Sequence, residues 1–364
     1  MSPDPIDSTA EKCRSNVYEL DERQLNDELI GLGQPQFRAR QVTEWIYQRG
    51  VTSFDEMTNL PKSLRELLQT RYRFGTLEVA VDQRSQDGTQ KRLYRLPDGQ
   101  MIESVLMPYQ DGRRTACISS QAGCAMGCSF CATGQMGFAR HLTAEEIFEQ
   151  AQLFSTELQR RGERLTNCVF MGMGEPFHNY DELIRAIHLI HDRLGIGARK
   201  MTVSTVGLVP KIRRFAEEGL QVKLAISLHS TLDEERSQIM PVNRRYPIAE
   251  LISACHDFVA VTKRRITFEW ALIQGQNDSE EEALRLARLL RGLLCHVNVI
   301  PLNPTSGYAG APSDPARVNR FIETLNDRGI PATIRVRRGI DIDAGCGQLK
   351  SQNEKKNQLT QIEG

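Results

Sequence analysis

The sequence predicts an α/β protein in which a partial (β/α)6 barrel follows a small helical domain and a connecting β-hairpin. Three observations lead to this fold class. Apolar residues recur at helical spacing between about residues 19 and 70, short strand-type runs with Asp-Gly turns occupy about 76–108, and strand-like and helix-like segments alternate from Thr115 onward. Repeated β/α units imply parallel strands with the helices outside, as in an open or partial barrel.

Residues 1–75 form the predicted helical domain. Leu25, Leu29, Val42 and Ile46 are among the apolar positions at helical spacing, which places them on one face of a helix. The next segment, residues 76–110, contains the runs LEVAVDQRS, QKRLYRLPDG and QMIESVLMP. We expect these runs to form an antiparallel hairpin that leads into the main domain.

Residues 111–349 make up the predicted barrel. Its strand-type runs are TACISS, NCVFMGMGEP, RKMTVSTVG, QVKLAISLHS, RRITFEWALIQG, HVNVIPLNP and PATIRVRRG. Helical stretches such as YDELIRAIHLIHDRL separate most of these runs. In such folds the chemistry gathers at the carboxyl ends of the strands, and several distinctive residues follow strands directly, so we expect one active site there. The polar residues 350–364 are expected to form a flexible tail.

Composition indicates a soluble protein of a reducing compartment. The 364 residues include nine cysteines, no apolar run long enough to cross a bilayer, and an N-terminus without the basic and then apolar profile of a signal peptide. We therefore expect a cytoplasmic protein with no membrane partner, whose thiols serve as ligands, nucleophiles or core residues. Cys13, Cys168, Cys255 and Cys295 stand in apolar or helical contexts and are expected to be packing residues.

Overall charge does not point to a polyanionic partner. Lys and Arg number 46, and Asp and Glu also number 46, so no global field attracts nucleic acid. Basic doublets and triplets do occur at the expected element ends. Taken singly each is a solvated surface patch, but together they would line one face if the fold gathers them. They are Arg113-Arg114, Arg160-Arg161, Arg199-Lys200, Arg213-Arg214, Arg244-Arg245, Lys263-Arg264-Arg265 and Arg335-Val336-Arg337-Arg338.

Three cysteines in the run GCAMGCSFCATG form the main chemical motif. Cys124, Cys128 and Cys131 have CxxxCxxC spacing, which brings three soft thiolates onto one loop. A [4Fe–4S] cluster normally takes four cysteines, one per iron, so three would leave one iron open to bind a cofactor or substrate. The alternatives are a structural zinc site with His141 as the fourth ligand, and a disulfide with a spare thiol, which suits a secreted protein.

The motifs together resemble a known family. The cysteine loop, the MGMGEP turn, the LAISLHS and IPLNP strand ends and the late IDAGCGQL are similar to those of the radical S-adenosylmethionine (SAM) RNA methyltransferases of the RlmN/Cfr family, which methylate a carbon of adenine. The resemblance runs from the helical segment through Leu349, and the combination of CxxxCxxC with the late Cys-Gly-Gln-Leu is its most specific part. It implies a radical-SAM barrel that holds a [4Fe–4S] cluster and uses two SAM molecules per turnover.

The resemblance also implies a SAM site. It puts Gly174 and Glu175 of the MGMGEP turn on the amino group of SAM, and glycines in general let the backbone approach a ligand closely. The residues that would hold the ribose, carboxylate or adenine of SAM are Ser204, Ser227, Leu228, His229 and Asn303. Taken alone, the serines would be ordinary strand-end hydroxyls and His229 a structural histidine.

Three further residues would carry the reaction. Adenine C2 and C8 are electron-poor C–H positions, so simple displacement on the sulfonium of SAM cannot methylate them and a radical route is needed. By the resemblance, the thiolate of Cys346 accepts a methyl group from one SAM, and a second SAM supplies the 5′-deoxyadenosyl radical that activates it. Cys117 then resolves the protein–RNA thioether through a transient disulfide with Cys346. Glu103 matches the family's proposed proton acceptor. From the residues alone, Cys346 between two glycines indicates an accessible loop thiol, whereas Cys117 and Glu103 are typical of a core residue and a surface carboxylate.

The implied substrates are an adenosine of 23S ribosomal RNA and the adenosine beside the tRNA anticodon, both methylated at C2. Pro176 after MGMGE is typical of the C2 branch, whereas the C8 branch, which confers antibiotic resistance, usually carries Ala there and stays an alternative. Two others are a radical-SAM enzyme without a methyl-cysteine relay and a zinc-stabilised RNA-binding protein.

The expected partners are structured RNA and an electron donor such as flavodoxin, and the protein is expected to be a monomer. A buried adenine must be unstacked before it can react, so the RNA must also be held by phosphate contacts. Candidates are the basic doublets and, in the helical domain, Arg38, Arg40, Arg49 and Arg65.

Overall fold

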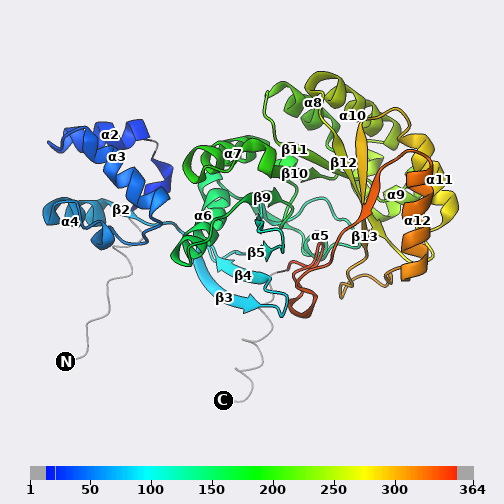
Figure 1. The fold of residues 1–364 in the computed structure, drawn as a ribbon, viewed down its shortest axis with the longest axis horizontal. Coiled ribbons are helices and arrows are strands. Elements are labelled where there is room, and N and C mark those ends of the chain that lie inside the picture. Colours follow the sequence, from blue (N-terminus) through cyan, green and yellow to red (C-terminus); the bar gives the residue numbers. More distant parts are fainter. Residues whose placement is uncertain (1–13, 21, 351–364) are drawn as a thin grey trace, which may run out of the picture.

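A ten-stranded sheet organises the molecule (Figure 1). The computed structural model describes residues 14–20 and 22–350, so Cys13 and, apart from Lys350, the tail expected at 350–364 lie outside the described residues. The strand order is β14-β13-β12-β11-β10-β9-β6-β5-β4-β3. Pairs from β6 to β14 are parallel, and pairs from β3 to β6 are antiparallel.

The predicted (β/α)6 barrel is confirmed, with six β/α units followed by a last strand. Its strands are β6 (Arg114–Cys117), β9 (Asn167–Phe170), β10 (Met201–Thr205), β11 (Lys223–Ser227), β12 (Ile266–Leu272), β13 (Cys295–Pro301) and β14 (Ala332–Ile334). The connecting helices, which lie outside the strands in Figure 1, are α6 (Ala144–Arg160), α7 (Tyr180–Leu194), α8 (Val209–Glu217), α10 (Ile248–Thr262), α11 (Glu280–Leu289) and α12 (Pro315–Asp327). Apolar side chains on both faces of the central strands are buried, as is typical of parallel strands covered by helices.

Shorter elements decorate the barrel. They are β7 (Gln121–Gly123), β8 (Phe138–His141), α5 (Ala132–Gln135), α9 (Asp233–Ile239) and single helical turns at Pro176–Asn179, Ala198–Lys200, Pro241–Arg244 and Ile340–Ile342. The strands β7 and β8 form a separate two-stranded antiparallel sheet. In the described part of the chain, no helix is long and apolar enough to cross a bilayer.

The segment expected to be a hairpin has a third strand. Its strands are β3 (Glu78–Arg84), β4 (Gln90–Arg95) and β5 (Met101–Pro108). β5 pairs with β6, with Val105 opposite Cys117, so this antiparallel extension continues the barrel sheet. Residues on both faces of β5 are buried.

The helical segment lies against the outside of α6 and α7 (Figure 1). Its elements are β1 (Ser15–Asn16), α2 (Glu22–Gly31), α3 (Phe37–Thr43), α4 (Lys62–Arg71), β2 (Tyr72–Arg73) and single turns at Val17–Glu19, Glu44–Gln48 and Phe54–Glu56. Arg193 of α7 donates hydrogen bonds to the carbonyls of Tyr18 (2.6 Å) and Leu20 (2.8 Å) and to the hydroxyl of Tyr47 (2.8 Å). Phe148 of α6 packs edge-on against Tyr18. These contacts fix the helical segment to the barrel.

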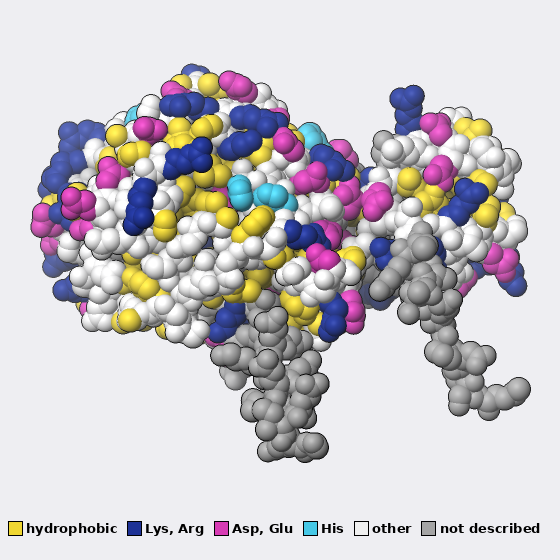
Figure 2. Space-filling model, turned by 180° about the vertical axis from the view of Figure 1, so that it is seen from behind, with side chains coloured by type: hydrophobic (Ala, Val, Ile, Leu, Met, Phe, Trp, Pro, Cys, Tyr) yellow, Lys and Arg dark blue, Asp and Glu magenta, His cyan; other side chains and the backbone are white. Residues whose placement is uncertain are grey.

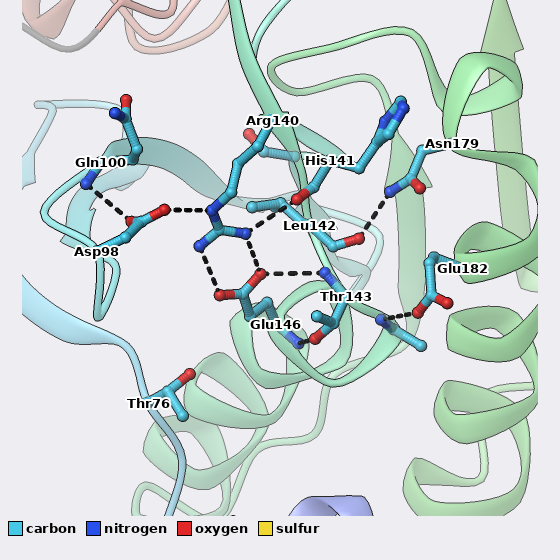
Figure 3. A network of polar contacts seen from close by, with 12 residues as sticks. Thr76, Asp98, Gln100, Arg140, His141, Leu142, Thr143, Glu146, Asn179 and Glu182 are labelled. Carbon is cyan, nitrogen blue, oxygen red and sulfur yellow. Dashed lines mark hydrogen bonds and ion pairs between the residues drawn. The ribbon is translucent and has the colours of Figure 1, made fainter. Parts of the chain in front are cut away.

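A polar network fixes the start of α6 (Figure 3). Thr143 caps the helix, and Glu146 completes the capping box by accepting from the Thr143 backbone N–H. The guanidinium of Arg140 makes two parallel hydrogen bonds to Glu146 (2.7 and 2.8 Å) and also pairs with Asp98. The network therefore joins the turn after β4, the strand β8 and the first helix of the barrel.

Basic and acidic side chains are interspersed over the face shown in Figure 2, on the barrel and on the helical segment alike. This pattern agrees with the balanced composition. A surface for a polyanion must therefore come from a local arrangement rather than from net charge.

Candidate active site

The three motif cysteines lie on one loop between β7 and α5. The backbone N–H of Cys124 donates to the carbonyl of Gly137 (2.7 Å), and that of Ser129 donates to Ile239 (3.0 Å). A Cβ at Gly134 would lie 2.8 Å from the carbonyl oxygen of Cys128, so only glycine lets α5 pack under the loop. The loop is thus held from both sides before any ligand binds.

The thiols of this loop are buried and influence one another. Burial raises the pKa of Cys124 to about 12, and it raises the pKa of Cys128 well above its usual value, with the charges of Cys131 and Cys124 adding to the effect. Burial also raises the pKa of Cys131, opposed by the backbone N–H groups of Gly134 and Thr133. Thiolates in such a place need a cationic partner. Three soft donors close together in a buried loop fit an iron–sulfur cluster.

The zinc alternative lacks its fourth ligand. His141 lies on β8, where its Nδ1 is 3.0 Å from Nε2 of Gln121 and its ring is 4.9 Å from that of His178. Among residues 14–20 and 22–350, no three His, Cys, Asp or Glu side chains converge closely enough to hold a single metal ion. A tetrahedral zinc site requires such convergence, whereas a cubane takes one cysteine at each of several irons.

A cavity beside the loop contains most of the expected SAM residues. Cys128 and Cys131 line it, together with Gly174, Glu175, Ser204, Ser227, His229 and Asn303. Leu228 differs from this set because its side chain is fully buried in the core. Its backbone N–H donates to Glu269 and its carbonyl accepts from Arg236. The side chain of Leu228 therefore does not face the cavity.

Glu175 is a buried carboxylate at the wall of this cavity. It accepts hydrogen bonds from the backbone N–H groups of Phe177 (3.0 Å) and Val206 (2.9 Å). Burial raises its pKa to about 7, against the lowering effect of these hydrogen bonds and that of Thr205. Within the described residues it has no cationic partner at ion-pair distance, so an ammonium group in the cavity would supply the missing charge. Gly174 has a φ of +100°, and a Cβ there would lie 2.6 Å from Gln121, so the turn requires glycine.

Two more polar groups are aimed into the cavity. His229 is buried, and its Nδ1 accepts from the backbone N–H of Ala271 (2.9 Å). Burial, and then the charge of Arg236, lowers the pKa of His229 to about 3, so the neutral ring carries its proton on Nε2 as a donor. Asn303 donates to the carbonyl of Cys346 (3.0 Å), and its buried Oδ1 has no partner in the described structure. That oxygen is free to accept from a ligand.

The loop that carries Cys346 is docked on the cysteine loop. The backbone N–H of Ala132 donates to the carbonyl of Gly347 (2.7 Å), and the hydroxyl of Thr133 donates to that of Leu349 (2.7 Å). Ala132 and Thr133 directly follow Cys131 in α5. Cys346 is half-buried and lines both the first cavity and a second one.

The second cavity contains the two cysteines expected to form a transient disulfide. Cys117, at the carboxyl end of β6, lines it together with Cys346. Other lining residues are Met107, Tyr109, Arg335, Arg337 and Arg338. Burial raises the pKa of Cys117 to about 12, with Cys346 adding to the effect and Arg335 opposing it. The two thiols thus line the same cavity, and the charge of Arg335 acts on the Cys117 thiol.

Sequence reasoning treated Arg335 only as part of a basic run. Its guanidinium lies 3.6 Å from Glu269, which also accepts from Nδ2 of Asn298 (2.8 Å). The charge of Cys346 is the largest contribution that raises the pKa of Arg335. Arg335 directly follows β14. This position at the carboxyl end of a barrel strand could have identified Arg335 from the sequence as a candidate site residue.

Glu103 lies near the second cavity without lining it. It lies on the same face of β5 as Val105 and Met107, which do line the cavity. Its carboxylate pairs with Lys91 (3.4 Å) and accepts from the backbone N–H of Lys350 (2.9 Å). Burial raises its pKa, against the effect of Lys91. A role in proton transfer would require the Lys350 contact to open.

Comparisons with known proteins agree with this geometry. Residues 118–287 match the family model of the Radical SAM superfamily, and residues 15–73 match that of the ribosomal RNA large subunit methyltransferase N-terminal domain. A curated relative from Myxococcus xanthus, named dual-specificity RNA methyltransferase RlmN 1, is 49% identical over 355 residues and covers 97% of both chains. A probable dual-specificity RNA methyltransferase RlmN from Chloroflexus aurantiacus is 48% identical over 351 residues and covers 93% of both chains.

A solved structure gives the same result. The crystal structure of a radical SAM methyltransferase from Sphaerobacter thermophilus is 50% identical, has a TM-score of 0.89 and covers 93% of this chain and 100% of that one. The barrel and the three-cysteine loop thus define a radical SAM enzyme, a class that uses SAM and a [4Fe–4S] cluster. Within this class, the chain belongs to the RlmN family.

Proposed function

We propose that this protein is a SAM-dependent RNA methyltransferase that methylates C2 of adenosine in 23S ribosomal RNA and in tRNA beside the anticodon. One observation carries the proposal: Cys346 lines two cavities, one with the cluster cysteines and the SAM residues, the other with Cys117. A methyl carrier has to reach both a donor and an acceptor in this way. The dual-specificity RlmN names of the relatives support C2 over the C8 alternative.

Cys124, Cys128 and Cys131 would hold the cluster and leave one iron for SAM. When bound and reduced, the cluster supplies the electron that cleaves SAM to a 5′-deoxyadenosyl radical. Glu175 binds the ammonium group of SAM, and Asn303 and His229 offer an acceptor and a donor to its other polar groups. Ser204 and Ser227 add hydroxyls on the same wall.

Cys346 accepts the first methyl group as a thiolate, which is the nucleophilic form of cysteine. Arg335 stabilises this negative charge, because its guanidinium lies within electrostatic reach of the Cys346 sulfur. Glu269 holds the guanidinium in place from the other side. A second SAM is then used to activate the S-methyl group, so that each turnover consumes two.

The adenine enters the second cavity, where its C2 meets the activated carbon on Cys346. The electron left over after this addition would return to the cluster. Attack of the Cys117 thiolate on the Cys346 sulfur then breaks the bond between that sulfur and the transferred carbon, which takes up a proton and becomes the new methyl group. This step releases the RNA and forms a disulfide, which an external thiol reduces by exchange. Glu103 accepts the proton that leaves the substituted carbon once its Lys350 contact opens.

The wider assignments rest on the same reasoning. We assign residues 1–75 to a helical accessory domain, 76–110 to the linker strands, 111–349 to the radical SAM barrel and 350–364 to a tail. All eight described cysteines are free, which supports a cytoplasmic location. The protein acts as a monomer and takes its electron from a donor such as flavodoxin.

The test is an anaerobic assay with isotope-labelled SAM and 23S ribosomal RNA, read by mass spectrometry of the nucleosides. We expect 2-methyladenosine, together with brown protein that holds about four irons per chain. Exclusive 8-methyladenosine would establish the C8 alternative. Colourless protein with one zinc and no methylated adenosine would refute the proposal.

A further inference from the structure

The amino ends of the barrel strands carry a row of basic side chains. Lys200 immediately precedes β10, Lys223 begins β11, and Arg264 and Arg265 precede β12. Because β10, β11 and β12 are neighbouring parallel strands, these side chains lie next to one another along the end of the sheet where the three strands begin. The fold thus gathers charges that the sequence shows as separate doublets.

This row is not neutralised by acidic side chains. In the described parts of the chain, Lys200, Lys223, Arg264 and Arg265 have no carboxylate at ion-pair distance. Lys223 shows the effect: burial lowers its pKa, and the charges of Lys200, Arg265, Arg264 and Arg113 lower it further. The cations therefore repel one another in the free protein, and a bound polyanion would relieve this repulsion.

The row continues through Arg113 to residues that line the second cavity. Arg113 lies at the amino end of β6, beside Tyr109, whose ring is 4.4 Å from the guanidinium carbon of Arg113 and 4.6 Å from that of Arg338. Tyr109 and Arg338 line the second cavity. From β6 through β9, β10 and β11 to β12 are four strand spacings, or about 19 Å. The basic row therefore leads away from the cavity that contains both catalytic thiols.

We propose that this basic row, Lys200, Lys223, Arg264 and Arg265, binds the phosphate backbone of the RNA strand that flanks the target adenosine. The proposal rests on the proposed function, since it takes the second cavity as the site of the adenine. Phosphate contacts from Lys and Arg set the register of a nucleic acid on a protein. Tyr109 packs against the guanidinium groups of Arg113 and Arg338 and so holds both cations beside the second cavity, where they can contact phosphate.

An acidic protein, such as an electron donor, is the competing occupant. An electron donor has to approach the cysteine loop, which follows the carboxyl end of β6. The basic row lies at the opposite ends of the same strands. Cys117 also lies at a carboxyl end, so the strand end alone does not separate the two occupants. The row is joined through Arg113 to Tyr109 and Arg338, which line the cavity proposed for the adenine. This continuity favours RNA.

The test compares two double variants with the same loss of charge. Lys223→Gln with Arg265→Gln removes two cations from the row, and both side chains are exposed. Arg288→Gln with Arg320→Gln removes two exposed cations from the outer helices α11 and α12 as the control. RNA affinity is measured against salt concentration with a 23S ribosomal RNA fragment, and methylation is measured with a chemical reductant in place of a protein donor.

We expect the slope of log affinity against log salt to fall by about 1.5 in the row variant, at about 0.7 to 0.9 per lost phosphate contact. KM for RNA should rise while the rate at saturating RNA stays unchanged. The control should match the wild type. Thermal denaturation reports whether the double variant is folded. If it is not, Lys223→Gln alone should lower the slope by about half as much.

An unchanged slope in the row variant would overturn the proposal. So would a defect that appears only when a protein electron donor replaces the chemical reductant, because it would assign the row to that donor. Failure of the proposed function is separate: the wild type would then bind RNA with the same salt dependence but yield no methylated adenosine.

Discussion

The role proposed for Glu175 predicts that SAM binding depends on pH. Its carboxyl is buried, and burial raises its pKa to about 7. Only the ionised form can pair with the ammonium of SAM. The carboxylate is present above its raised pKa and is lost as the pH falls through that value, so SAM affinity should fall on acidification. For a single group with a pKa of about 7, the dissociation constant should rise about 25-fold between pH 7.5 and pH 5.5.

Glu175→Gln removes the charge and keeps the shape. A charge-assisted hydrogen bond contributes about 1.5–3 kcal/mol, so SAM affinity at pH 7.5 should fall about 10- to 150-fold. The pH dependence should also disappear. The new amide can accept from only one of Phe177 and Val206 with its oxygen, which leaves two N–H groups facing each other and costs about 1–3 kcal/mol of stability.

Calorimetric titration of SAM into anaerobically reconstituted protein at several pH values measures both effects. Glu146→Gln is the control, because it also neutralises a buried carboxylate, which lies at the start of α6 (Figure 3) and does not line the cavity. It keeps the capping box and loses the charge that pairs with Arg140 together with one of the two hydrogen bonds that Arg140 donates, so the melting temperature should fall while SAM affinity stays unchanged. A wild-type dissociation constant that does not vary from pH 5.5 to 7.5, or a Gln variant that binds SAM normally, would refute the reasoning.

Three further substitutions test the relay. Cys346→Ala should abolish RNA methylation while SAM cleavage to 5′-deoxyadenosine persists; unchanged yield of methylated RNA would exclude the methyl carrier. Cys117→Ala should leave RNA covalently attached to the protein on a denaturing gel, and normal release of methylated RNA would contradict its resolving role. Arg335→Met removes the cation that stabilises the Cys346 thiolate and lowers the pKa of Cys117, so methylated RNA should form more slowly at pH 7 and the rate should partly recover at pH 9, whereas a defect independent of pH would count against this effect.

The barrel was predictable because the pattern of apolar residues along the chain alternates between that of buried strands and that of amphipathic helices. Buried strand runs such as those of β11 and β12 alternate with amphipathic helices, and parallel strands follow from that order. The third run of the antiparallel extension was expected to be a strand, but its pairing with β6 was not foreseen. QMIESVLMP has no apolar–polar alternation, since both faces of β5 are buried, and its pairing with β6 depends on where the barrel remains open.

The site was partly predictable for a similar reason. Residues directly after parallel strands, such as Glu175 and Asn303, must meet at one end of the barrel. Side-chain direction within a strand end is harder to foresee, and Leu228 points into the core while His229, with a φ of 62°, turns toward the cavity. The partner of Glu103 was also hidden, because Lys91 and Lys350 are far from it in sequence and reach it only through the fold.

The two hydrogen bonds from Ala132 and Thr133 to the chain around Cys346 have a practical consequence. The loop of Cys346, the proposed methyl acceptor, is docked on the short helix that directly follows Cys131, a proposed iron ligand. Damage to the cysteine loop, as in air, would therefore also displace Cys346. Material that has been oxidised and then refilled with iron should regain full alkylation of Cys346 only as the short helix reforms. The cysteine loop and the loop of Cys346 therefore have to be protected from oxidation together, as one structural unit.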